Sequence, residues 1–276
     1  MTRRRLPAPE RWLRVAIYFA AMLAVSMWTE IIGHVWGMWP TRRGSRERVL
    51  RCNFAMKQWG MVLTKLTFSV LKSRLDVVGR VPLDMRPGRF IIVSNHQSTA
   101  DIAILIWALS DLELRYVAKE ELGHGLPAVS MALRHFGSAL IAREGLREDL
   151  LRMKTMAAGL EHWDASVIIF AESTRSRDGS LLPYKSAAVR IVAKEAQLPI
   201  LPIAIDGTHV AADLPGFARD MPGAIGRIVI GEAIAPEAYK GRIDDVVAEI
   251  RDWTHAIIEE GRRSGAVPPP PGWSPD

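Results

Sequence analysis

The sequence predicts an α/β fold: a mainly parallel seven-stranded sheet flanked by helices, with an N-terminal membrane-associating helical segment. Short apolar runs of strand length alternate along the chain with longer segments in which apolar residues recur every three or four positions. This alternation is typical of parallel sheets with helical crossovers. The composition, 49% hydrophobic and 24% charged over 276 residues, is that of a folded chain with a large core. The single cysteine excludes an intrachain disulfide and a four-cysteine zinc site.

The N-terminal segment is both apolar and basic. Residues 15–29 carry no charge, and after Glu30 the apolar run continues to Trp39. This uncharged run is shorter than the roughly 20 residues that a helix needs to span a bilayer, and a carboxylate within hydrocarbon is costly. Residues 1–51 contain ten arginines and three glutamates, a charge of +7, so the rest of the chain sums to −1. Arginines on both sides of the apolar run suit a helix that lies in one leaflet beside anionic headgroups.

Four interpretations of this segment remain open on the sequence alone: in-plane insertion into one leaflet, a transmembrane anchor, a cleaved signal peptide, or a buried helix. The first two both attach the chain to a membrane. We therefore predict a phospholipid membrane as the partner of residues 1–45, and a location at the cytoplasmic face of the inner or plasma membrane. No nucleic-acid partner is expected, because nucleic-acid-binding domains usually spread a basic stripe over their folded surface.

The rest of the chain divides into an α/β domain over residues 46–264 and a proline-rich tail over residues 265–276. Apolar residues spaced by three and four predict an amphipathic helix from about residue 46 to residue 72. Short apolar runs predict seven strands, at residues 75–78, 90–93, 115–118, 139–142, 167–170, 200–205 and 227–230. Longer periodic segments predict helices at residues 101–109, 127–136, 147–163, 186–196 and 243–262.

The clearest candidate for chemistry follows the strand predicted at residues 90–93. Open α/β sheets place their sites in loops at the carboxyl ends of strands, and this loop carries His96 five residues before Asp101. A histidine oriented by a carboxylate is a general base with a defined tautomer, able to take a proton from an alcohol. The same residues also fit a helix cap in which Asp101 accepts backbone N–H groups. One carboxylate could serve both roles.

Two arginines follow other predicted strands. Arg143 comes directly after the strand at residues 139–142, and Arg175 lies in the turn after the strand at residues 167–170. The planar guanidinium group binds phosphate in a forked geometry, and small hydroxyl-rich turns present N–H groups to anions. Together with His96 at a third strand end, these arginines predict a cleft for a phosphate-bearing substrate.

The order of these motifs resembles that of the glycerolipid acyltransferase family, and of the lysophosphatidate acyltransferases in particular. The matching blocks are Asn95 to Asp101, Lys119-Glu120 with Leu122 and Pro127, Gly137 to Arg143, Phe170 to Ser176, Pro183-Tyr184-Lys185, and the strand around Pro202. Together they extend over about residues 45–235. Two positions depart from the family, since Ser173 and Ser186 stand where glycine is usual.

The resemblance implies roles for individual residues. His96 is the implied base and Asp101 its partner, and Arg143 and Arg175 are the implied phosphate ligands. The other residues implied to bind substrate are Glu172, Ser173, Thr174, Lys185 and Pro202.

The function that the resemblance implies is transfer of a fatty acyl group from acyl-CoA or acyl-ACP to the free hydroxyl of lysophosphatidate, giving phosphatidate in phospholipid synthesis. The thioester is a co-substrate. No cofactor or metal is expected, because the other histidines show no metal-ligand spacing. Two alternatives remain. One is acyl transfer to another acceptor, such as glycerol 3-phosphate, a lyso-ornithine lipid or another lysolipid. The other is a catalytically silent membrane-binding protein.

Overall fold

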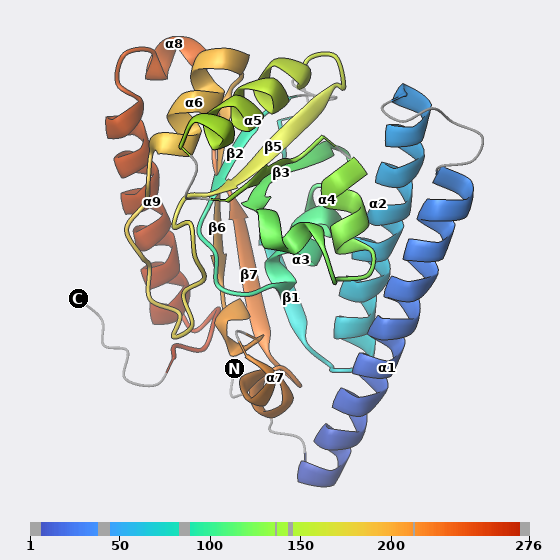
Figure 1. Ribbon diagram of the computed structural model, residues 1–276. Helices are drawn as coiled ribbons and strands as arrows, with labels where there is room; N and C mark the ends of the chain where they lie inside the picture. The colour runs from blue at the N-terminus through green and yellow to red at the C-terminus, as the bar shows by residue number, and fades with distance from the viewer. Residues whose placement is uncertain are drawn as a thin grey trace.

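The computed structural model describes residues 7–37, 45–82, 89–135, 137–142, 146–211 and 213–270. Its strands are β1 (Arg74–Val78), β2 (Ile91–Ser94), β3 (Glu113–Lys119), β4 (Ala139–Ile141), β5 (Ala165–Phe170), β6 (Ile200–Asp206) and β7 (Ile225–Ile230). They form one sheet in the order β1-β7-β6-β2-β5-β3-β4 (Figure 1). All seven predicted strands are therefore present, and their ends differ from the prediction by no more than two residues.

The sheet is mainly parallel, as the alternation of strands and helices predicts. β2 lies between β5 and β6 and runs parallel to both, whereas β6 and β7 form the one antiparallel pair among the described strands. The register pairs Ser94 at the end of β2 with Phe170 at the end of β5. The residues that follow these two strands therefore leave the sheet at the same edge.

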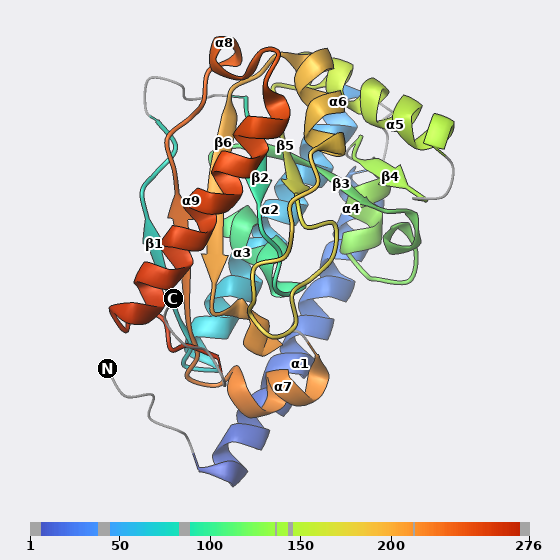
Figure 2. The same ribbon diagram turned by 90° about the vertical axis from the view of Figure 1, so that its left-hand side faces the viewer.

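Helices cover both faces of the sheet (Figure 1, Figure 2). One face is covered by α2 (Arg46–Ser69), α3 (Ala100–Ala108) and α4 (Val129–His135), and the other by α5 (Leu146–Gly159), α6 (Ala187–Ala196) and α9 (Ile243–Arg263). Successive residues of β2 alternate between the two cores: Ile92 packs with the first set of helices, Ile91 and Val93 with the second. The whole strand is buried, which explains its continuous apolar run.

Some element boundaries differ from the prediction. The helix predicted to end at residue 72 ends at Ser69, and the one predicted to end at residue 163 ends at Gly159. In both cases a residue soon after has a left-handed backbone that a helix cannot continue through: Lys72 with φ +56° and Asp164 with φ +47°. Phe136, the end of another predicted helix, lies outside the described residues.

Two short helices were not predicted, and the predicted tail begins inside the fold. The short helices are α7 (Leu214–Asp220) and α8 (Pro236–Tyr239), which follow β6 and β7 along the chain. In the tail, Val267 is fully buried and donates its backbone N–H to the Gly261 carbonyl at 3.1 Å. The folded domain therefore extends past residue 264.

The N-terminal helix α1 (Ala8–Ile32) lies alongside α2 (Figure 1) and continues into a π-helical turn (Gly33–Gly37). Its inner face makes polar contacts with α2: Trp59 Nε1 donates to Ser26 Oγ at 2.9 Å, and Thr67 Oγ1 donates to the Tyr18 hydroxyl at 3.2 Å. The exposed apolar side chains of α1 and the turn after it are Trp12, Leu13, Ile17, Leu23, Met27, Trp28, Ile31 and Val35.

Glu30, the charge that interrupts the apolar run, points inward. Its carboxylate accepts the backbone N–H of Ala128, just before α4, at 2.7 Å. Within the described residues, Ala8–Val35 is the one helical stretch long and apolar enough to cross a membrane, judged by length and composition. Because 22% of its most apolar window is buried inside the structure, the interpretation as a buried helix is disfavoured.

Candidate active site

His96 and Asp101 form a hydrogen-bonded pair at the carboxyl end of β2. The distance from His96 Nδ1 to Asp101 Oδ2 is 2.8 Å, and Asp101 is fully buried in the first turn of α3. The same oxygen accepts the backbone N–H groups of Gln97 at 2.8 Å and Ser98 at 2.9 Å. The carboxylate therefore holds the backbone of the loop before α3 and orients the imidazole at once, so one carboxylate serves both roles.

Phe170 fixes the plane of the imidazole. Its ring stacks on that of His96 with centroids 3.9 Å apart and planes 14° apart. The two contacts hold the imidazole ring at one edge and on one face. When Nδ1 donates its proton to Asp101, Nε2 carries the lone pair, which is the arrangement of a general base.

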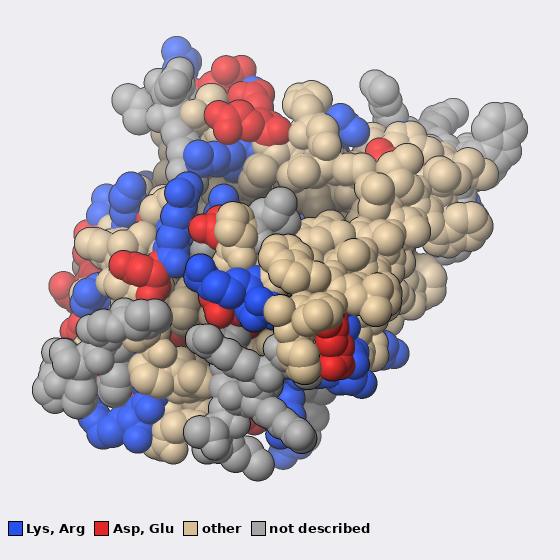
Figure 3. Space-filling view, turned by 90° about the horizontal axis from the view of Figure 1, so that it is seen from below, with Lys and Arg blue, Asp and Glu red and all other residues tan. Residues whose placement is uncertain are grey.

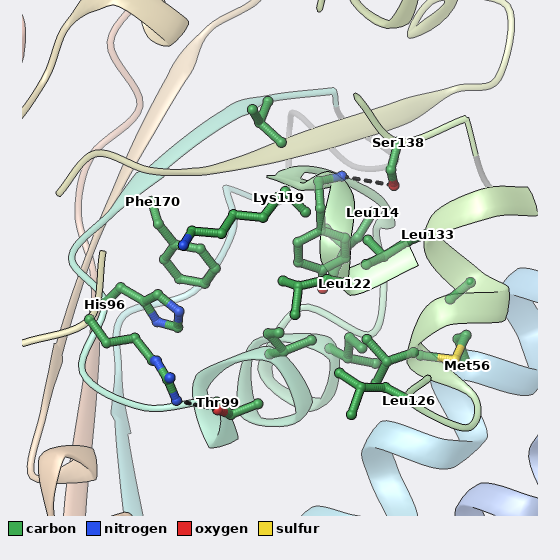
Figure 4. A pocket seen from close by; sticks show the side chains of 18 of the residues that line it. Met56, His96, Thr99, Leu114, Lys119, Leu122, Leu126, Leu133, Ser138 and Phe170 are labelled. Carbon is green, nitrogen blue, oxygen red and sulfur yellow. Dashed lines mark hydrogen bonds between the residues drawn. The ribbon is translucent and has the colours of Figure 1, made fainter. Parts of the chain in front are cut away.

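A largely apolar pocket of about 560 Å³ begins beside this pair. Figure 4 shows His96, Lys119 and Phe170 at one end and Met56 and Leu126 at the other. The wall between them consists mainly of side chains from α3, β3 and α4 and the segment before α4. Two of the lining residues, Lys57 and Glu113, form an ion pair with a 2.5 Å separation. The volume is within the range of sites that enclose a small molecule or a lipid chain.

Basic side chains surround the mouth of the pocket. Arg175, Arg177 and Lys119 are exposed and line it. Arg175 Nη1 donates to Thr99 Oγ1 at 2.7 Å, which ties the guanidinium group to the start of α3. Figure 3 shows a band of Lys and Arg beside a broad uncharged surface. Arg143, the other predicted phosphate ligand, lies outside the described residues.

Glu172 lies behind His96 and not in the wall of the pocket. It is 2% exposed, and its two carboxylate oxygens accept the backbone N–H of His96 at 3.2 Å and of Leu182 at 3.0 Å. Burial is the main cause that raises the pKa of this carboxyl to about 7. Its neighbours Ser173 and Thr174 do line the pocket.

Ser173 has the left-handed backbone that glycine normally supplies. Its φ is +59°, and its N–H donates to the Phe170 carbonyl at 2.9 Å. A serine in this conformation is strained relative to glycine. The turn therefore has the left-handed conformation that glycine adopts most readily, and Ser173 places a hydroxyl group at the pocket.

Two predicted site residues are not brought to the pocket. Lys185 has an exposed side chain, and its backbone N–H donates to the Ala171 carbonyl at 2.8 Å. Pro202 is buried within β6, where its carbonyl accepts the N–H of Gly231 at 2.9 Å. Neither residue lines the pocket.

Three residues of the site had not been assigned a role from the sequence. Lys119 ends a strand whose carboxyl end meets the same sheet edge, so its position was a usable signal. Phe170 looks like an ordinary strand residue, and its stacking on His96 depends on β2 and β5 being neighbours. Gln97 is fully buried and bonds to residues more than 100 positions away, which the sequence does not indicate.

Comparisons with known proteins show similarity to acyltransferases in sequence and in fold. The family model described as Acyltransferase matches residues 76–206. A 1-acyl-sn-glycerol-3-phosphate acyltransferase of Limnanthes douglasii is 33% identical over 59% of this chain and 57% of its own length. That of Helicobacter pylori is 29% identical over 69% of this chain and 71% of its own. The crystal structure titled 1-acyl-sn-glycerophosphate (LPA) acyltransferase, PlsC, from Thermotoga maritima superposes with a TM-score of 0.64, 22% identity, and coverage of 97% and 100%.

Residues 76–206 match the Acyltransferase family model, and the fold of the chain is similar to that of the Thermotoga maritima structure. In sequence the chain is similar to 1-acyl-sn-glycerol-3-phosphate acyltransferases, the lysophosphatidate type. The chain spans 57–63% of the length of the plant relatives from Limnanthes douglasii and Cocos nucifera.

Proposed function

We propose that this protein transfers a fatty acyl group from the thioester of acyl-CoA or acyl-ACP to the free hydroxyl of lysophosphatidate, giving phosphatidate. The observation that carries the proposal is a histidine held by a buried aspartate at the basic mouth of an apolar pocket. The activity for which the relatives are named supports lysophosphatidate as the acceptor. The thioester is a co-substrate, and the proposed chemistry calls for no resident cofactor.

In the proposed reaction, His96 Nε2 takes the proton of the acceptor hydroxyl while Asp101 stabilises the resulting imidazolium. The hydroxyl oxygen attacks the thioester carbonyl carbon, so a C–O bond forms and the C–S bond breaks. The thiolate leaves with the proton from His96, which returns the imidazole to its starting state. No acyl-enzyme forms, since the acceptor itself is the nucleophile.

The charged and apolar parts of the site bind different parts of the substrates. Arg175 and Lys119 bind the acceptor phosphate at the mouth, and the resemblance implies Arg143 as a further phosphate ligand. The apolar pocket takes the acyl chain, which places the thioester carbonyl beside His96.

The protein binds the membrane through α1, which lies in the bilayer interface and does not cross the bilayer. α1 packs along α2, which in turn packs on α3 of the domain. If α1 spanned the bilayer, α2 would carry the exposed Lys65 and the ion-paired Lys57 into hydrocarbon, which is costly. In the proposed arrangement the apolar face of α1 is buried at the headgroup boundary of the cytoplasmic face, with the flanking arginines on anionic lipid.

The direct test is substitution of His96. His96→Ala removes the base, and we expect thioester consumption and phosphatidate formation to fall by about 10²–10⁴ or more. Asp101→Asn should also lower turnover, because it leaves the imidazole without its carboxylate. The matched control is His162→Ala, at an exposed histidine outside the pocket.

The assay should use a panel of acceptors: lysophosphatidate, glycerol 3-phosphate and other lysolipids. Turnover retained by a folded His96→Ala variant would refute the mechanism. Wild-type protein that binds vesicles but consumes no thioester with any acceptor would refute acyl transfer and favour a membrane-binding role.

A further inference from the structure

A buried ion pair lies beneath the site, at the carboxyl end of β6. Arg262, near the end of α9, donates from Nη2 to Asp206 Oδ1 at 2.7 Å and from Nε to Asp206 Oδ2 at 3.0 Å. The two side chains are 4% and 5% exposed. Arg262 lies outside the part of the chain that matches the family model.

The ion pair is connected to the loop that carries His96. Asp206 Oδ1 also accepts Gln97 Nε2 at 3.2 Å, and Gln97 is the residue after His96. The Gln97 side-chain oxygen accepts the backbone N–H of Thr208 at 3.2 Å and of His209 at 3.3 Å, while its own backbone N–H donates to Asp101. Buried hydrogen bonds therefore fix both the backbone and the side chain of Gln97. The backbone bonds to the Asp101 carboxylate, and the side chain bonds to Asp206 and the residues that follow it.

The ion pair is also connected to the loop that carries Arg175. Arg262 Nη2 donates to the Gly179 carbonyl at 2.6 Å. Gly179 has φ +80°, and a Cβ there would lie 2.9 Å from His209 Nδ1, so the backbone approaches this closely only because the residue is glycine. The Arg262 guanidinium group thus joins α9 directly to the Arg175 loop, and through Asp206 and Gln97 to the His96 loop.

A buried ion pair is a weak source of stability, because removing both charges from water offsets much of their attraction. Its forked geometry, however, fixes the groups it joins in one arrangement. We infer that Arg262, acting through Asp206 and Gln97, is a positioning residue that sets the His96 loop relative to the Arg175 loop. The expected effect on kinetics rests on the proposed function. The predicted ordering of the two loops can be measured without substrate.

The test compares Arg262→Lys and Arg262→Gln with Arg263→Gln, a control at the exposed neighbour on the same helix. Lysine keeps the charge and loses the fork, whereas glutamine loses both. A misplacement near 1 Å at a reacting group costs on the order of 10² in rate, so we expect kcat to fall by about tenfold in Arg262→Lys and about a hundredfold in Arg262→Gln. The KM for the thioester should change by less than about threefold, because the acyl pocket lies elsewhere.

Hydrogen–deuterium exchange on the full-length protein supplies the second readout. Amide protection should fall at residues 96–98 and 174–180 in the Arg262 variants and stay unchanged in Arg263→Gln. If Arg262→Gln does not fold, Arg262→Lys carries the test.

A folded Arg262→Lys variant with wild-type kcat and wild-type loop protection would overturn the inference. So would failure of this variant to fold, since the pair would then serve folding itself. A wild-type protein that transfers no acyl group would refute the proposed function, whereas the exchange experiment would still decide whether Arg262 orders the two loops.

Discussion

Two buried carboxyl groups flank His96, and their surroundings differ. Asp101 accepts the imidazole and two backbone N–H groups on one oxygen, at 2.8–2.9 Å. Glu172 accepts two backbone N–H groups, at 3.0 and 3.2 Å. Burial is the main cause that raises the pKa of its carboxyl group to about 7. Asp101 is thus hydrogen-bonded to the ring of His96, and Glu172 to its backbone N–H. The two carboxyl groups fix the side chain and the main chain of the same residue.

The raised pKa of Glu172 predicts a pH dependence of stability. The folded value of about 7 is above the ordinary value of 4.5, so the folded state binds the proton more tightly than the unfolded state. The resulting stabilisation is fully present below about pH 4.5 and is lost as the pH rises through about 7. In Glu172→Gln this loss should disappear, although the variant is less stable overall because an amide nitrogen faces a backbone N–H.

The measurement is the free energy of unfolding from urea titrations between pH 4.5 and pH 8. Glu237→Gln, at an exposed carboxylate, is the control and should follow the wild type. If the wild type and Glu172→Gln lose the same free energy over this pH range, Glu172 is not the titrating group.

At the scale of elements, the central strands were predictable because they are buried and short. β2 and β6 are entirely buried, so each reads as an unbroken apolar run. α8 was not predictable, since four residues are too few to show a helical period. In α7, Pro215 and Gly216 lie in the first turn, and this pair of residue types is typical of a loop. A turn follows the end of α5 at Gly159 and closes at Asp164, whose left-handed backbone side-chain periodicity does not indicate.

The same limit applies to the site. His96 and Asp101 were predictable because they follow one strand and lie five residues apart. The pocket was not, because its wall combines α2, α3, β3 and α4, whose proximity depends on the order of strands in the sheet. Pro202 lies in a strand that neighbours β2, so it is close along the sheet and yet buried away from the pocket.

Helix α4 provides the clearest test of the acyl pocket. Ala132 is 5% exposed and lines the pocket, so Ala132→Leu should fill part of its volume. We expect the ratio of kcat/KM for long-chain over medium-chain thioesters to fall by at least about tenfold, since single methylenes in a closed pocket discriminate to this extent.

The matched control is Arg134→Leu, which adds an apolar side chain at an exposed position of the same helix, outside the pocket. It should leave chain-length preference as in the wild type. An unchanged preference in a folded Ala132→Leu variant would place the acyl chain elsewhere.

At the scale of the whole molecule, one face of α1 packs into the core and the other face is exposed. Val15 and Tyr18 pack with Ala218 and Met221, around α7, so deletion of the N-terminal segment would expose part of the core. The opposite face of α1 carries a run of exposed apolar side chains, including Trp28 at 64% and Leu23 at 57%. A contiguous exposed apolar surface of this kind marks an interaction site.

Charge substitutions on that face test membrane binding without disturbing the core. The double variant Leu23→Glu/Trp28→Glu should reduce sedimentation with vesicles of anionic phospholipid by about tenfold or more, because two side chains lose favourable burial. Leu151→Glu is the control, at an α5 residue that is 62% exposed. Undiminished binding of the double variant would assign the membrane contact to another surface.

The place of β1 in the sheet has a consequence for how the chain folds during synthesis. β1 lies at one end of the sheet and pairs with β7, so Arg74 meets Ile225. At the usual rate of about 5–20 residues per second, β1 is made on the order of 10 s before β7 exists. Throughout that interval β1 lacks its partner strand and α1 lacks its contact with α7, although α2 can already pack on α3. β1 therefore joins the sheet only after the last of the described strands has left the ribosome.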